Sequence, residues 1–128
     1  MPHISYSALK NWDFCPFYHK LTYIDKIKMF KGNVYTAFGT ALHEACEKVT
    51  LNESIDPSKV FSESFEKEVL ILNNLNDKEK SMVIDMRSQG LELSTLVLKA
   101  LNVKFPGYVV FSAEEQIFQP IDDTPSEY

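Results

Sequence analysis

The chain opens with ISYSALKNWDFCP (residues 4–16), and this stretch shapes how the rest of the sequence is interpreted. Ser5 and Ser7 precede a short run that ends near Trp12, and either serine can cap a helix there. Proline disfavours helix at the residue before it. We therefore expect a short helix that stops or changes direction at Pro16.

Longer helices are expected downstream, because apolar residues recur at helical spacing. One helix should span Ala37–Leu51, and another should begin at Pro57, which suits the first helical turn. A third helix should run from about Lys78 to Leu101. Gly90 is a weak point in that helix, since glycine is a poor helix former.

The character of the sequence changes after Pro106-Gly107. Tyr108-Val109-Val110-Phe111 is rich in strand-forming residues, which predicts a strand or hairpin over 108–119, followed by a polar tail at 120–128. A lone β element needs partners to be stable. We therefore predict a mixed α/β fold in which residues 1–128 form the N-terminal part of a single domain, helical over 5–102, with its sheet only begun.

Composition limits the classes of protein that the chain can belong to. It has 128 residues, of which 45% are hydrophobic and 24% charged, as in ordinary globular proteins. A formal net charge of −5 argues against a protein that coats nucleic acid nonspecifically, but a nuclease with a local basic groove remains compatible. No apolar run reaches the roughly 20 residues of a membrane span, and no signal peptide is evident. We expect an intracellular, cytoplasmic protein.

Two motifs carry a resemblance to a known family. The first combines Ser5 and Ser7 with Trp12, Cys15-Pro16 and the aromatic residues behind them, and the second is Gly39-Thr40-Ala41-Leu42-His43 at a helix start. In this order and spacing, the two motifs resemble the opening of RecB-like nucleases of the PD-(D/E)XK superfamily.

The resemblance implies a restriction-endonuclease-like core that hydrolyses phosphodiester bonds in DNA with Mg²⁺ or Mn²⁺. It points to an exonuclease of recombination, repair or phage replication, in a bacterial or phage-infected cell, with a helicase or recombination protein as a further partner. The family's catalytic Asp and Glu-x-Lys do not follow in these residues, so we expect the 128-residue chain to be inactive by itself.

The resemblance also assigns site residues. His43 takes the place of the histidine that helps to hold the metal, and Glu115 matches a glutamate spaced as Glu-x-x-Phe through Phe118. Both would serve the catalytic metal site. The simpler alternatives are an ordinary helix-surface or core histidine and a solvated carboxylate.

The cysteines allow two metal hypotheses besides magnesium. In some relatives the Cys-Pro cysteine is a ligand of an iron–sulfur cluster, and Cys15 has that position, although a packed structural role is favoured. Alternatively, Cys15 with His19 and His43 with Cys46 have the spacing of two ligand pairs for zinc. Burial of a small residue explains Cys46 more simply.

Lysines near the N-terminus suggest how DNA would be bound. Lys20, Lys26 and Lys28 are the candidates for phosphate contacts, and they alternate with aromatic residues. Such a mixture can bind single-stranded DNA, but we interpret Trp12 and Phe14 as core. The competing functions are a non-catalytic helical module that binds DNA or protein, and a zinc-stapled helical domain.

Overall fold

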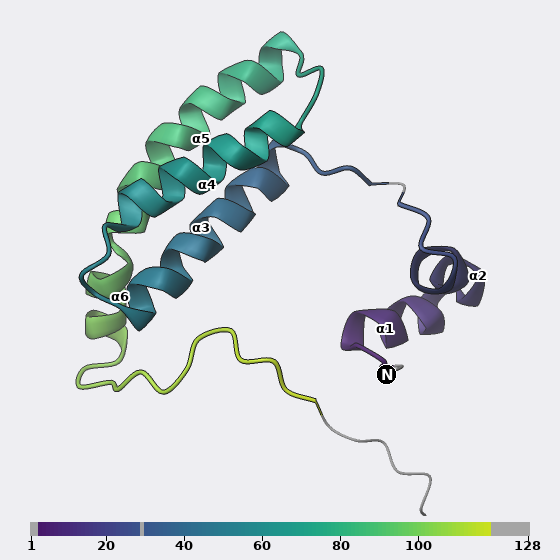
Figure 1. The fold of residues 1–128 in the computed structure, drawn as a ribbon, viewed down its shortest axis with the longest axis horizontal. Helices are drawn as coiled ribbons and strands as arrows, with labels where there is room; N and C mark the ends of the chain where they lie inside the picture. The colour runs from purple at the N-terminus through teal and green to yellow at the C-terminus, as the bar shows by residue number, and fades with distance from the viewer. Residues whose placement is uncertain (1–2, 29, 119–128) are drawn as a thin grey trace, which may run out of the picture. The chain divides into compact units, whose positions relative to one another are not determined.

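The computed structural model describes residues 3–28 and 30–118, and the regular elements within them are all helical. The chain divides into two compact units, Met1–Gly32 and Asn33–Tyr128. Figure 1 shows the helices of each unit. The predicted polar tail at 120–128 lies outside the described residues.

The first unit is built from short helical segments. α1 (Tyr6–Phe14) begins at Ser5, whose hydroxyl accepts a hydrogen bond from the Ala8 amide at 3.1 Å. α1 ends at Cys15, and Pro16 starts α2 (Pro16–His19), which leads into a π-helical turn, η1 (Lys20–Ile24). The predicted break at Pro16 is confirmed, and Ser5 is the capping serine.

A few contacts between side chains hold this unit together. Ala8 is the one buried residue among those described in it. The Asn11 side-chain amide donates to the Tyr23 hydroxyl at 3.4 Å, and the His19 ring stacks on Tyr23 with their centres 5.1 Å apart. We call these four residues, Ala8, Asn11, His19 and Tyr23, the inner side of the first unit.

The second unit is a helical bundle. Its elements are α3 (Val34–Leu51), α4 (Pro57–Ile71), α5 (Asp77–Thr95) and α6 (Val97–Lys104). α3, α4 and α5 contact one another pairwise and run side by side (Figure 1). Asn33 and Asn76 close capping boxes at the starts of α3 and α5, which satisfies amides that a helix start leaves without partners.

The core of the bundle joins small residues to large ones. Ala37, Ala41 and Ala45 recur every four residues, so they share one side of α3 and let α4 approach closely. Phe61 and Phe65 of α4 fill the space, both 0% exposed, with ring centres 5.3 Å apart. The apolar sides predicted for α3 and α4 are confirmed at the core. In the third predicted helix, Val83 is buried but Leu93 and Leu96 are 45% and 43% exposed.

Gly90 marks a close approach of α5 to α4. A Cβ atom added to Gly90 would overlap the ring of Phe61, which is completely buried. The glycine is therefore a packing requirement, and α5 continues through it to Thr95. The helix predicted over 78–101 is instead interrupted at Leu96, where α5 ends and α6 follows.

We expect Gly90→Ala to lower the free energy of unfolding by about 1–3 kcal/mol, because overpacking Phe61 outweighs the better helix propensity of alanine. Gly39→Ala is the matched control. Gly39 also lies inside a helix, but a Cβ there meets nothing within 4 Å, so we expect a gain of about 0.5–1 kcal/mol. Urea unfolding of the 128-residue chain measures both changes. Stabilisation by Gly90→Ala would contradict this account of the core.

The predicted mixed α/β fold is wrong for the described residues, which contain no strand or sheet. The segment predicted as a strand or hairpin over 108–119 is irregular through residue 118, and Glu114 has a left-handed φ of +56°. Its side chains favour strand locally, but a ladder needs a neighbouring strand to pair the backbone groups. The described chain offers none, so local propensity does not produce a strand.

No helix in residues 3–28 or 30–118 is both long enough and apolar enough to span a bilayer.

Candidate functional site

His43 lies near the middle of α3, on the side away from the core. The neighbouring Ala41 and Ala45 are 0% exposed, whereas the His43 side chain is 58% exposed. The helix is firmly started by Asn33, whose side chain accepts from the Thr36 amide at 2.9 Å. A packed helix thus holds an imidazole at the surface of the second unit.

Glu114 is the partner of His43. The distance between His43 Nε2 and Glu114 Oε1 is 2.9 Å. The left-handed backbone of Glu114 is uncommon for a residue other than glycine, and it bends the chain at this contact. Because both side chains are more than half exposed, the pair contributes little to stability. If Nε2 donates the hydrogen, Nδ1 keeps a free lone pair.

Glu115, the glutamate chosen from the sequence, has a different contact. Its carboxylate accepts from the Ser112 hydroxyl at 3.0 Å. In a strand, neighbouring residues point to opposite faces, so Glu114 would not share the face of Glu115. That rule does not apply to the irregular backbone seen here. The spacing to Phe118 favoured Glu115 in the sequence, and a site role for Glu115 stays a prediction.

A hollow of about 440 Å³ lies beside His43, lined by Gly39, Thr40, His43, Glu44 and Glu47. Gly39 helps to keep it open, since it has no side chain and the space where a Cβ would sit is empty within 4 Å. The glycine and histidine of the predicted motif are therefore brought together at one hollow.

The wall of the hollow is negative at neutral pH. Hydrogen bonds from Lys48 and then from Ser64 lower the pKa of Glu44 below its usual value, and the Lys48 Nζ lies 2.6 Å from the Glu44 carboxylate. Glu47 adds a second carboxylate to the lining. Because Lys48 pairs with Glu44, the negative charge of the lining comes mainly from Glu47, and it favours cations over phosphate groups.

His43 and Glu114 fit part of a divalent-metal site. Imidazole nitrogen and carboxylate oxygen are both common metal ligands. Within residues 3–28 and 30–118, however, no group of three or more His, Cys, Asp or Glu side chains is arranged to hold a metal ion. The described residues therefore supply one candidate ligand, His43, with the carboxylate that pairs with its ring, and they do not complete the site.

The residues predicted to contact DNA lie in the first unit. Lys20 is paired with Asp25 at 3.0 Å. Lys26 and Lys28 are exposed, and neither has an ion-pair partner among the residues that the structure describes. Lys26 and Lys28 are therefore the freer cations of the three.

Both cysteines carry free thiols in the structure. Cys15 is half-buried at the junction of α1 and α2, and Cys46 is half-buried on α3, where burial raises the pKa of its thiol. Cys15 and His19 lie in the first unit, whereas His43 and Cys46 lie in the second. No group of three or more ligand side chains occurs in the described part of the chain, so neither the zinc site nor the iron–sulfur cluster gains support there.

An imidazole paired with a carboxylate beside an open hollow matches one ligand position of a metal-assisted hydrolase and no more than that. The family model of the PD-(D/E)XK nuclease superfamily matches residues 3–106, and the chain belongs to this superfamily. This confirms the superfamily resemblance stated from the sequence. Comparisons with curated proteins and with solved structures gave no match.

Proposed function

We propose that this chain serves metal-dependent hydrolysis of phosphodiester bonds in DNA, as part of an exonuclease of recombination, repair or phage replication. The observation that carries the proposal is the superfamily match over 3–106, which includes the helix that presents His43. The His43–Glu114 pair at the edge of the hollow supports it independently.

The charge of the hollow explains why a metal would be needed. Glu44 is paired with Lys48, and the remaining carboxylate of the lining, Glu47, disfavours a DNA phosphate that approaches His43 without a counterion. Mg²⁺ or Mn²⁺ would supply Lewis-acid stabilisation of the phosphate and an activated water. His43 would be one ligand of that ion, with its ring held by the neighbouring carboxylate.

The complete gene product should degrade DNA in Mg²⁺ or Mn²⁺, stop on addition of EDTA, and resume when the metal is restored. The 128-residue chain should remain inactive under the same conditions. Release of labelled nucleotides from an end-labelled duplex and from a closed circle measures the activity and separates exonuclease from endonuclease action. Degradation that continues in EDTA would contradict the proposal.

A non-catalytic module that binds DNA is the second candidate. It is favoured by Lys26 and Lys28, which are exposed in the described part of the chain and can contact phosphates without a metal. In that case the complete gene product would bind DNA but leave it intact with either metal, so the same assay separates the two functions.

A further inference from the structure

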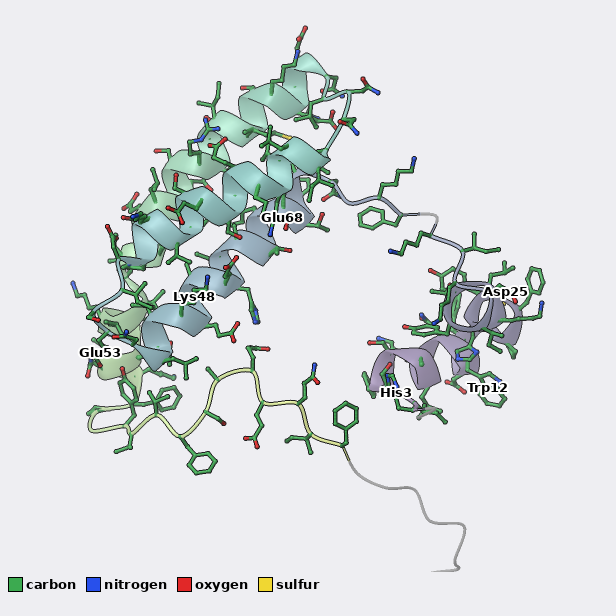
Figure 2. All side chains as sticks on the ribbon, viewed as in Figure 1. His3, Trp12, Asp25, Lys48, Glu53 and Glu68 are labelled. Atoms are coloured by element: carbon green, nitrogen blue, oxygen red, sulfur yellow. The ribbon has the colours of Figure 1, made fainter. Side chains whose placement is uncertain are left out.

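The first unit exposes aromatic rings that its own packing does not use. We call residues 12–18, at the end of α1 and in α2, the aromatic segment. Trp12 is 53% exposed and Phe14 is 85% exposed, so the interpretation of these two residues as core differs from the structure. Phe17 and Tyr18 are also exposed, and Figure 2 shows Trp12 at the edge of its unit.

These rings are separate from the contacts that form the inner side of the unit. That side is made by Ala8, the Asn11–Tyr23 hydrogen bond and the stacking of His19 on Tyr23. A single exposed aromatic residue is ordinary. Four exposed rings within seven consecutive positions are a local concentration of exposed apolar side chains, a feature typical of interaction sites.

Charge narrows the choice of partner. Residues 1–32 contain five lysines and two aspartates, which gives a formal net charge of +3, whereas residues 33–128 have a formal net charge of −8. Lys26 and Lys28 follow the aromatic segment without ion-pair partners in the described part of the chain. The unit that carries the exposed rings is thus also the positive part of an acidic protein, which fits an anionic partner.

We infer that the aromatic segment is a stacking platform for the unpaired bases of single-stranded DNA, with Lys26 and Lys28 contacting its phosphates. A single strand offers both flat base surfaces and a phosphate backbone, so it matches rings and lysines together. A duplex hides its base surfaces, and only its phosphates would match. The choice of DNA as the polyanion rests on the proposed function, but the platform is distinct from the hollow at His43.

Trp12 is the single tryptophan of the chain, so its fluorescence reports on this surface directly. In EDTA, where no cleavage is expected, an oligothymidylate of about 12 nucleotides should quench Trp12 as bases stack on it. A duplex of equal length and an abasic strand should bind more weakly and quench less. Equal binding of the duplex or of the abasic strand would overturn the inference, and so would the absence of quenching.

Two substitutions test the two components of the platform. Phe17→Ala should weaken oligothymidylate binding roughly 5- to 100-fold through lost stacking. Its control is Phe111→Ala, which removes a ring that is 94% exposed in the second unit and should leave binding within about twofold. Equal weakening by the two variants would overturn the inference.

Replacing Lys26 and Lys28 with glutamine should lower the salt dependence of binding by about 1.4 in the logarithmic slope, or about 0.7 for each phosphate contact. Lys59→Gln with Lys99→Gln is the control, since both lysines are exposed on helices of the second unit. An unchanged slope in the first pair would overturn the role of these lysines.

A second copy of the chain is the competing occupant of the rings. Self-association would shift the emission of Trp12 with protein concentration in the absence of DNA, and that result would overturn the assignment to DNA. Because binding is measured without metal, its failure is separate from a failure of the nuclease assay. If the protein degrades DNA but its tryptophan is not quenched, the stacking platform is contradicted and the proposed nuclease function is not.

Discussion

Phe61→Ala is expected to lower the free energy of unfolding of the 128-residue chain by about 3–5 kcal/mol. Phe61 is 0% exposed, stacks on Phe65, and meets the edge of Phe38 with ring centres 5.8 Å apart. Alanine would leave a cavity bounded by three helices. Since small proteins are stable by only about 5–15 kcal/mol, the variant should be largely unfolded at moderate urea concentrations.

The control for this substitution lies on the same helix. Leu70 belongs to α4 but is 80% exposed, so Leu70→Ala should change stability by no more than about 0.5 kcal/mol. Circular dichroism during urea unfolding measures both variants. Similar losses from Phe61→Ala and Leu70→Ala would show that α4 does not pack on α3 and α5 as described.

Phe61 also couples to Gly90, which gives a sharper test of the core. Because a Cβ at Gly90 would overlap the Phe61 ring, shortening that ring should relieve the cost of Gly90→Ala. In a double-mutant cycle, Gly90→Ala should therefore cost less in a Phe61→Leu background than in the unmodified chain. If the free-energy costs of the two substitutions simply add, α4 and α5 are farther apart at Gly90 than described.

The helices were predictable because their pattern is local. Phe61 and Phe65 are four residues apart, a spacing that places both on one side of a helix, and they form the core. The role of Gly90 was not predictable in this way. From the sequence, a glycine inside a helix only indicates lower helix stability. Its contact with a ring of another helix is a feature of tertiary packing, which the local sequence does not show.

Residues 108–118 show the opposite case, in which a strong local signal gave the wrong structure. Val109 and Phe111 favour strand, yet they are 89% and 94% exposed on irregular backbone. Strand propensity is largely a measure of packing against neighbouring strands. A sequence window can report the preference of these residues but cannot supply the neighbours that would realise it.

Only the part of the candidate site that depends on local spacing could be predicted from the sequence. Gly39 and His43 are one helical turn apart, so the sequence alone brings them together, and both line the hollow. The pairing of His43 with Glu114 joins residues far apart in the chain. Its geometry depends on the left-handed backbone of Glu114, which no periodicity indicates.

His43→Ala should lower the Mg²⁺-dependent nuclease activity of the complete gene product by at least about 100-fold, because residues that only orient a metal ligand already contribute about 10- to 100-fold. The helix should be unaffected, since the His43 side chain lies outside the core and is 58% exposed. Circular dichroism checks folding, and activity across a range of Mg²⁺ concentrations checks the role. A metal ligand predicts partial recovery at high Mg²⁺, and undiminished cleavage would exclude His43 from the site.

Substitution of the two neighbouring glutamates tests which carboxylate orients His43. Glu114→Ala removes the carboxylate 2.9 Å from the imidazole, and we expect about a 10- to 100-fold loss of activity with a higher Mg²⁺ requirement. Glu115→Ala removes the same charge one residue away, where the carboxylate accepts from Ser112, so its effect should be smaller. The reverse order would favour the sequence-based assignment of Glu115. Equal and small effects would mean that His43 acts without a carboxylate partner from this segment, even if His43→Ala is inactive.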